Sequence, residues 1–236
     1  MLDQSFVDSY SLKSAPWGFN GLGEIVFLRT YSRKKENGDT ELWHETLQRV
    51  INGAIEIGAQ LTDEEAQKLF DHCFNLRASF SGRSLWQLGT PLVKKLNGTS
   101  LNNCYFTNIE KIEDFELLFE YLMLGGGVGF SVERSKIHDL PKVKTGVTIT
   151  HERSNDADII VPDSRQGWKR LLHAVLKSYF HTGKSFSYST ILIREYGAPL
   201  NTFGGTASGP GALIDGIKDI CGVMDNRVGK KLRSID

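Results

Sequence analysis

The chain has 236 residues, of which 40% are hydrophobic and 24% are charged, and its formal net charge at pH 7 is zero. This composition is that of a globular protein with room for one large domain or two small ones. The neutral balance argues against nucleic acid or an acidic membrane as a partner held by overall charge, and the sequence contains no apolar run of about 20 residues that could span a bilayer.

The cysteine content and the N-terminus predict a protein of the reducing cytoplasm. The first residues, "MLDQSFVDSYSLKSAPWGF", lack the apolar core of a secretory signal. Three cysteines, Cys73, Cys104 and Cys221, are too few for a disulfide framework. Their spacing does not match a zinc site, so we expect no bound metal on these residues.

The N-terminal part of the chain is predicted to be mainly helical after an irregular start. Residues 1–23 carry turn signals such as "APWGFNGLG". Residues 39–61 predict a helix because apolar side chains recur there at helical spacing, and Asp39 or Thr40 can cap it.

A second helix is predicted over residues 61–80. Thr62 is the expected N-cap, and Glu65 three residues later completes a capping box. Cys73 falls on this helix and is interpreted as a buried structural thiol. The stretch "SGRSLWQLGTP", residues 81–91, is expected to break the helix.

Strands and helices alternate along the second half, which favours an α/β layer fold. Asp163 or Ser164 can cap one of these helices. Residues 199–213, "PLNTFGGTASGPGAL", read as a glycine-rich loop. Strands are expected at 100–109, 128–135, 147–152 and 185–197, and helices at 113–127, 163–183 and 213–232.

Several glycine-containing motifs invite a nucleotide-binding interpretation. "HTGKS" fails as a P-loop because Ser178 occupies the position of the first glycine. "GGGVGF" fails as a dinucleotide fingerprint because residue 130 is Phe. The glycines of 125–129 either allow close approach of a ligand to the backbone or end a helix beside a packed strand. "GGTASGPG" at 204–211 either binds phosphate or forms a turn.

Cys104 stands in "SLNNCYFTN", between two asparagines and two aromatic residues. Taken alone, a cysteine in such a short apolar stretch is most simply a packed core thiol. The surrounding motifs favour a thiol that takes part in a reaction, because "GRSLWQLGT", "SLNNC" and "GGGVGFSVE" follow one another at close spacing.

This combination resembles ribonucleotide reductase and, more narrowly, the monomeric, class II, adenosylcobalamin-dependent ribonucleoside-triphosphate reductases. The resemblance runs along nearly the whole chain. "PWGFNGLGEIVFLRTYSR" resembles the N-terminal entry of the family, and "SGRSLWQLGT", "SLNNCYF" and "GGGVGFSVERSKI" resemble its first barrel strands. "PDSRQGW", "IREYGAPLNTFGGTASGPGALI" and "NRVGKKLRSID" resemble the region peculiar to the monomeric subgroup.

The resemblance implies an α/β fold with a defined order of parts. A mainly helical region at 1–98 would lead into the first part of a ten-stranded α/β barrel at 99–236, incomplete in this chain. An insertion at about 136–215 would help to form the specificity-effector site. A related dimeric reductase with a diiron subunit is the less favoured relative, because "PDSRQGW" and "GGTASGPG" resemble the monomeric subgroup.

The chemistry that the resemblance implies is replacement of the ribose 2′-hydroxyl by hydrogen, for DNA synthesis. Adenosylcobalamin generates a thiyl radical on one cysteine, and two further cysteines deliver electrons and become a disulfide. Cys104 matches the first of those two. A ribonucleoside triphosphate substrate, a deoxynucleotide effector and a thioredoxin-type reductant are the implied partners.

The resemblance also assigns binding residues. Arg83 and Ser84 would lie on the loop that holds the substrate phosphate, and Asn102 and Asn103 would line the substrate site. Gly126 and Gly127 would let the substrate lie against the backbone. Contacts to a deoxynucleotide effector would come from Asp163, Ser164 and Arg165, although helix capping explains Asp163 and Ser164 as well.

The thiyl cysteine, the disulfide partner of Cys104 and most of the cobalamin site are expected beyond residue 236, in a missing C-terminal portion that either belongs to the same gene or forms a separate chain. The 236 residues alone are therefore expected to be inactive. The alternative is a truncated or split fragment that binds nucleotide without catalysis.

Overall fold

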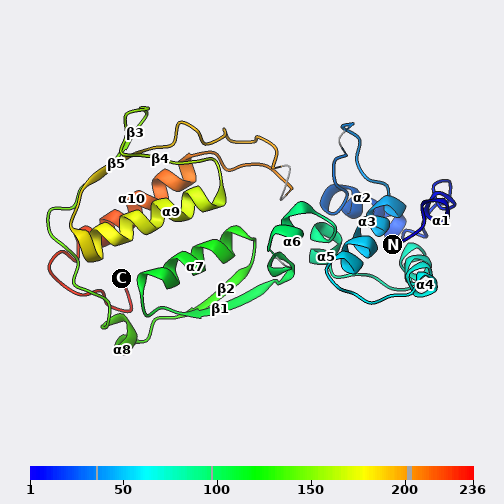
Figure 1. The fold of residues 1–236 in the computed structure, drawn as a ribbon, viewed down its shortest axis with the longest axis horizontal. Helices are drawn as coiled ribbons and strands as arrows, with labels where there is room; N and C mark the ends of the chain where they lie inside the picture. Colours follow the sequence, from blue (N-terminus) through cyan, green and yellow to red (C-terminus); the bar gives the residue numbers. More distant parts are fainter. Residues whose placement is uncertain (36, 97, 201–203) are drawn as a thin grey trace. The chain divides into compact units, whose positions relative to one another are not determined.

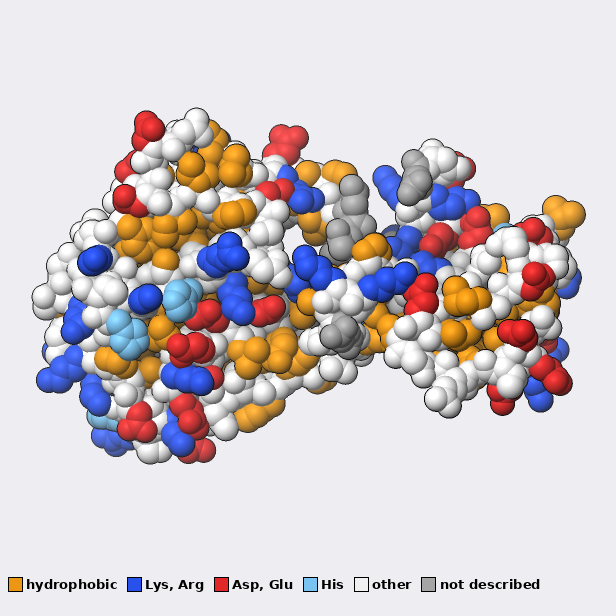
Figure 2. All heavy atoms as spheres, viewed as in Figure 1, with side chains coloured by type: hydrophobic (Ala, Val, Ile, Leu, Met, Phe, Trp, Pro, Cys, Tyr) orange, Lys and Arg blue, Asp and Glu red, His pale blue; other side chains and the backbone are white. Residues whose placement is uncertain are grey.

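The computed structural model describes residues 1–35, 37–96, 98–200 and 204–236, and these divide into two compact units, each with its own hydrophobic core (Figure 1). The first unit contains residues 1–103 and residue 204, and the second contains Cys104–Leu200 and Gly205–Asp236. In the described ranges, no helix is both long and apolar enough to cross a membrane. Figure 2 shows acidic and basic side chains interspersed over the face in view, as the zero net charge leads one to expect.

The first unit is built from helices packed around α3 and α4. Leu47 and Val50 of α3 and Phe70 of α4 are fully buried at its centre. Its helices are α1 (Gln4–Asp8), α2 (Leu22–Thr30), α3 (Trp43–Glu56), α4 (Asp63–Phe74), α5 (Gly82–Gln87) and α6 (Pro91–Leu96).

The predicted start of α4 is confirmed. The Thr62 hydroxyl accepts a hydrogen bond from the Glu65 backbone N–H at 3.2 Å, and the Glu65 carboxylate accepts one from the Thr62 N–H at 2.8 Å. This reciprocal pair satisfies two N–H groups that a helix otherwise leaves without partners. Cys73 is buried on this helix, as predicted.

The predicted cap of α3 is wrong. The helix begins at Trp43, and its N-cap position is Leu42 rather than Asp39 or Thr40. The Glu45 carboxylate accepts the Leu42 N–H at 2.7 Å and so supplies the capping hydrogen bond. Thr40 instead forms an isolated antiparallel β-bridge with Lys34.

Short helices occupy two segments that the sequence did not predict as helical. Residues 1–23 contain α1, which is capped by the Asp3 carboxylate. Residues 81–91 contain α5 and the first residue of α6, so the expectation that 81–90 forms one of the first barrel strands is wrong.

The second unit begins with a parallel strand–helix–strand arrangement. β1 (Cys104–Asn108) pairs in parallel with β2 (Gly127–Ser131), and α7 (Ile112–Met123) connects them. Figure 1 shows α7 lying between this strand pair and α9 (Arg165–Lys177).

The remaining elements of this unit are α8 (Arg134–Ile137), β3 (Ile149–Glu152), β4 (Ile159–Ile160), a π-helical turn (Ser178–Thr182), β5 (Phe186–Ser189) and α10 (Gly211–Asp225). The three strands form a second parallel sheet, with the strand order β3-β5-β4. α9 and α10 pack against each other, and Leu171 and Val175 of α9 are fully buried in the core of the unit.

The α/β class is confirmed, while several elements differ from prediction. The strand expected over 185–197 ends at Ser189, because the chain then turns, with the Ile193 N–H bonded to the Thr190 carbonyl. The last helix is α10, shifted from the predicted 213–232, and β4 was not predicted. Part of the predicted loop at 199–213 lies outside the described residues.

Candidate functional site

Cys104 is the exposed thiol of the chain. It is the first residue of β1, whereas Cys73 lies buried in α4 and Cys221 half-buried in α10. Burial raises the pKa of Cys73 to about 11 and also raises the pKa of Cys221. A thiol must be accessible and able to ionise in order to react. Cys104 is therefore better placed to react than Cys73 or Cys221.

The β1–β2 pair presents Cys104 on an open face. In register, Cys104 pairs with Gly127 and Phe106 pairs with Gly129. Side chains alternate across a strand, so Cys104 and Phe106 share one face and Tyr105 occupies the other. Tyr105 stacks on Tyr121 of α7, which places α7 on the face opposite Cys104. The thiol therefore stands beside a strip of exposed backbone, with Phe106 67% exposed next to it.

The two glycines expected at the substrate differ in their surroundings. Gly127 is exposed beside Cys104. Gly126 is buried, and a Cβ atom there would lie 2.4 Å from Cε2 of Tyr105. The requirement for glycine at 126 thus follows from packing against Tyr105, one of the two interpretations left open by the sequence. Its contact with substrate stays a prediction.

Arg83, Ser84, Asn102 and Asn103 lie in the first unit, and the structure brings Arg83 and Asn103 together. Arg83 Nε donates to Asn103 Oδ1 at 2.9 Å, and the guanidinium lies 5.5 Å from the Trp86 ring centroid. Ser84 Oγ lies 2.9 Å from the hydroxyl oxygen of Ser81, the N-cap of α5. Asn102 and Asn103 are exposed.

A buried ion pair that the sequence did not reveal holds α5 in place. Arg49 Nε donates to Glu41 Oε1 at 2.7 Å, and Arg49 Nη2 donates to Glu41 Oε2 at 2.9 Å. The same guanidinium donates to the Leu85 and Leu88 carbonyls, and Arg33 Nη1 donates to the Trp86 carbonyl. Burial, followed by the charge of Arg49, lowers the pKa of Arg33. These arginines fix the backbone of the helix that carries Arg83.

The residues expected at the effector site begin α9. Ser164 Oγ accepts the Gly167 N–H at 3.0 Å, so Ser164 is the cap that the sequence predicted as one of two choices. Asp163 accepts from Arg194 Nε at 2.6 Å instead. Arg165 carries a buried Nη1 atom without a hydrogen-bond partner among the described residues. Burial lowers the pKa of Arg165, and the charge of Glu120 opposes that shift.

No local sequence pattern points to Arg194 or Glu120, because both reach the start of α9 or its side from distant segments of the chain. Glu120 of α7 also binds Lys169 at 2.6 Å. One turn earlier on α7, Glu116 lies 2.6 Å from His173 Nδ1. The α7–α9 contact therefore combines an apolar core with a row of charged side chains.

Comparison with known proteins identifies the relatives of this chain. Residues 2–90 match the family described as the ribonucleotide reductase alpha domain, and residues 133–224 match the insertion domain of B12-dependent ribonucleotide reductase. Together these matches cover most of the chain.

Curated relatives carry one name, adenosylcobalamin-dependent ribonucleoside-triphosphate reductase. The protein from Euglena gracilis is 36% identical, with 98% of this chain and 34% of the relative covered. The protein from Lactobacillus delbrueckii subsp. bulgaricus is 35% identical, with 100% and 40% covered. A crystal structure of a B12-dependent (class II) ribonucleotide reductase superposes with a TM-score of 0.81 at 31% identity, covering 99% of this chain and 41% of that one.

The chain thus spans well under half the length of these relatives, within their N-terminal part. The first family match lies in the first unit and the second almost wholly in the second unit, while the superposition covers 99% of this chain. The chain belongs to the B12-dependent ribonucleotide reductase family, of which it represents an N-terminal portion.

Proposed function

We propose that this chain supplies the N-terminal part of an adenosylcobalamin-dependent ribonucleoside-triphosphate reductase, and that Cys104 is one of its two reducing thiols. The observation that carries the proposal is the placement of Cys104. Its thiol is exposed at the start of β1, on the face opposite α7, next to exposed Gly127.

The proposed reaction breaks the ribose C2′–O bond, forms a C2′–H bond and releases water. Two thiols supply two electrons and two protons and become a disulfide, which a thioredoxin-type reductant restores. Cys104 is an accessible thiol, while Cys73 is buried and Cys221 lies within α10. The second reducing thiol is therefore assigned to the portion of the enzyme that this chain does not span.

Substrate binding is assigned to the side chains near α5 and to the backbone of β2. Arg83 would contribute positive charge toward phosphate, and the amides of Asn102 and Asn103 would offer donors to ribose or phosphate. The hydrogen bond between Arg83 and Asn103 supports a joint role for these two side chains.

The β1–β2 pair is proposed to form the first two strands of the ten-stranded barrel. Its hydrogen-bonding edges and the exposed Phe106 and Phe130 would then be covered by later strands. Strand edges left uncovered promote aggregation, so the complementary portion is expected to raise the solubility of this chain.

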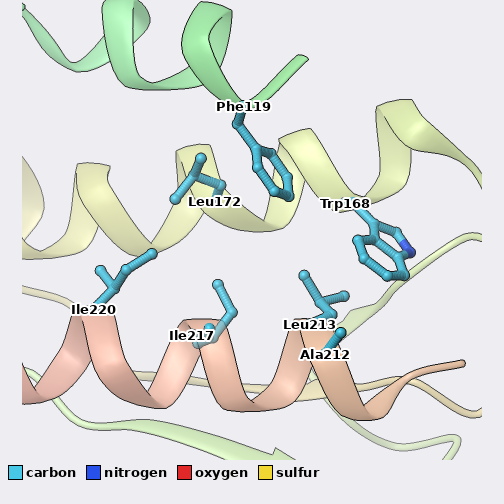
Figure 3. Close-up of a pocket in the computed structure, with 8 residues that line it drawn as sticks. Phe119, Trp168, Leu172, Ala212, Leu213, Ile217 and Ile220 are labelled. Carbon is cyan, nitrogen blue, oxygen red and sulfur yellow. The ribbon is translucent and has the colours of Figure 1, made fainter. Parts of the chain in front are cut away.

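The described cavities offer few polar groups to the cofactor of such an enzyme. The cavities found between α7, α9 and α10, one of which is drawn in Figure 3, have almost wholly apolar linings. We therefore assign no residue of this chain to adenosylcobalamin, which when bound supplies the radical chemistry of the family.

The test is reconstitution with the complementary portion of the Lactobacillus delbrueckii relative. Ribonucleoside-triphosphate reduction in the presence of adenosylcobalamin is expected from the pair and not from this chain alone. Cys104→Ser should abolish turnover while leaving nucleotide affinity within about twofold. Full turnover by Cys104→Ser, or turnover by the isolated chain, would contradict the proposal.

A second candidate is a nucleotide-binding fragment without catalysis. The buried, unpartnered Nη1 of Arg165 favours it, because such an atom is costly unless an acceptor reaches it. Under this alternative, a deoxynucleotide effector is bound by Asp163, Ser164 and Arg165. A chain that binds deoxynucleotide, yet stays inactive with its complementary portion, would favour this candidate.

A further inference from the structure

Positive charge is concentrated on one part of the second unit, near the end of α9. Figure 2 shows Lys and Arg side chains gathered at the left-hand edge of this unit, where Figure 1 places the end of α9. Three segments meet there, residues 140–146, 178–187 and 226–231, and their sequences contain no Asp or Glu. Because the formal net charge of the whole chain is zero, this surface differs from the average surface of the protein.

Backbone hydrogen bonds hold the three segments together. The Val143 N–H donates to the Lys230 carbonyl at 2.9 Å, and the Gly229 N–H donates to the Val143 carbonyl at 2.8 Å. On the next residue, the Lys144 N–H donates to the Tyr179 carbonyl at 2.7 Å. The charges of the three segments therefore belong to a single surface.

The lysines of this surface point into solvent. Val143 is buried, and side chains alternate along an extended segment, so its two neighbours share the exposed side. A Cβ atom on Gly183 would lie 3.8 Å from the Cβ of Lys144, which places the next lysine, Lys184, beside it. We call these four exposed side chains the cationic patch: Lys142, Lys144, Lys184 and Lys230.

The four lysines of the cationic patch form no ion pair with any described residue. Other charged groups nearby are already engaged. Arg227 binds Asp236 at 3.0 Å, the Lys231 ammonium donates to the His138 carbonyl, and the Asp225 carboxylate accepts the Tyr179 hydroxyl at 2.9 Å.

Folding alone does not account for this concentration of charge. A cation near the end of a helix is stabilised by the negative end of the helix dipole. That effect explains a single lysine close to the end of α9, and it falls off within the last turn. Four like charges drawn from three segments repel one another instead, unless an anion lies among them.

We propose that the cationic patch binds an acidic segment of a partner protein, a stretch rich in Asp and Glu. Lysine ammonium groups are separate point charges on flexible stems. Such groups suit carboxylates that are spread along an extended chain, and complementary charge of this kind speeds association and selects the partner. The inference does not depend on ribonucleotide reduction, so it can hold where the proposed function fails.

Nucleic acid is the less suitable polyanion for this surface. Single-stranded nucleic acid is held by aromatic rings that stack on its bases. In the three segments, Tyr179 and Phe180 are buried and Phe186 is half-buried. Phosphate is also bound in bidentate fashion by arginine, whereas Arg227, the arginine of these segments, already pairs with Asp236.

The experiment uses the full 236-residue chain and a fluorescein-labelled peptide of about 20 glutamates as the acidic probe. Fluorescence anisotropy at about 0.15 M salt is expected to show saturable binding that weakens as the salt concentration rises. A peptide of the same length made of glutamine is expected not to bind.

The decisive variant combines Lys142→Glu with Lys144→Glu, which should weaken binding of the glutamate peptide about tenfold or more. The matched control combines Lys68→Glu with Lys218→Glu. These lysines are exposed outside the patch, and the change in net charge is the same. Its affinity should stay within about twofold of the wild type. Lys184→Glu provides a further variant, with an expected loss of about threefold, should the first pair lower the thermal stability of the chain.

Three results would overturn the proposal. The first is absence of saturable binding to the glutamate peptide. The second is an equal loss of affinity in the two double variants, because overall charge would then explain the binding. The third is tighter binding of a single-stranded oligothymidine of the same length, because phosphate would then be the preferred ligand of the patch.

Discussion

Tyr105 of β1 and Tyr121 of α7 stack with their ring centroids 4.0 Å apart and their planes 12° from parallel. This contact turns Tyr105 toward α7 and leaves Cys104, one residue earlier, on the opposite face of the strand. The Tyr105 ring also covers the backbone of Gly126, at the point where α7 leads into β2. One aromatic contact therefore joins strand, helix and glycine loop around the proposed reducing thiol.

Gly126→Ala is expected to destabilise the second unit by about 1–3 kcal/mol, since overpacking forces side chains or backbone to shift. The new Cβ would lie 2.4 Å from Tyr105 Cε2 and 3.2 Å from the Tyr121 carbonyl oxygen. Thermal and urea unfolding measure the change.

The matched control for this substitution is Gly222→Ala. Gly222 lies inside α10, and a Cβ there meets no atom within 4 Å. Alanine is the better helix former, so this variant should be neutral or more stable by up to about 1 kcal/mol. Equal losses in both variants would refute the role given to the Tyr105 contact.

Glu41→Gln should destabilise the first unit by on the order of 3 kcal/mol, because it leaves the charge of Arg49 buried without its partner. Both side chains are largely shielded, and the pair is bidentate. Glu110→Gln is the control, since the Glu110–Lys136 pair is 44% exposed on each side and should contribute less than about 1 kcal/mol. A loss below 1 kcal/mol for Glu41→Gln would show that the pair does not hold α5.

Structural features that depend on a few consecutive residues could be predicted from the sequence. Features that depend on contacts with residues far away in the sequence could not. The Thr62–Glu65 capping box is a local signature, and it was predicted correctly. The helix α5 is only six residues long, and its carbonyls are held by Arg49 and Arg33 from elsewhere in the chain. No local sequence pattern therefore predicts α5.

The same distinction between local and distant contacts applies to the residues of the candidate site. Cys104 could be singled out from its neighbours in the sequence, and its exposure on an open strand face is compatible with that interpretation. The sequence left the role of Gly126 undecided, because the deciding contact comes from the Tyr105 ring, twenty-one positions earlier. Likewise, Asp163 could not be told from Ser164 as the cap without the position of Arg194.

Thiol labelling should separate the three cysteines. At pH 8, Ellman's reagent is expected to react rapidly with one thiol per chain, because Cys104 is exposed while burial raises the pKa of Cys73 and Cys221. Cys104→Ser should remove the rapid phase, and all three thiols of the wild type should react in denaturant. A rapid phase that persists in Cys104→Ser would contradict the described placement.

Alkaline pH should destabilise the first unit through Cys73. Burial raises the pKa of Cys73 to about 11 in the folded chain, against an ordinary value of 9.0. Below pH 9 both states keep the proton. Between pH 9 and 11 the unfolded chain loses it first, so the free energy of unfolding falls, by about 1.4 kcal/mol per pH unit at most.

Urea unfolding at pH 8 and pH 10.5 measures this dependence. Cys73→Ala is expected to be less stable at pH 8, because it leaves a small cavity. Its stability should nevertheless decline less steeply between the two pH values. Tyr10, whose pKa burial raises to about 12, contributes a further decline that both proteins share. Identical slopes would exclude Cys73 as the source.

Ser164 and Arg165, adjacent at the start of α9, are expected to separate folding from nucleotide binding. Ser164→Ala removes the cap on the Gly167 N–H and should lower the free energy of unfolding by about 1 kcal/mol, leaving deoxynucleotide affinity unchanged. Arg165→Met keeps the apolar stem and removes a guanidinium whose buried Nη1 has no described partner, so it should not destabilise the chain. If Arg165 meets the effector phosphate, affinity for a deoxynucleoside triphosphate falls at least tenfold, measured by calorimetry on the same samples used for thermal unfolding. Unchanged affinity in Arg165→Met would remove this arginine from the effector site and leave residues 163–165 with the structural roles that their described contacts already explain.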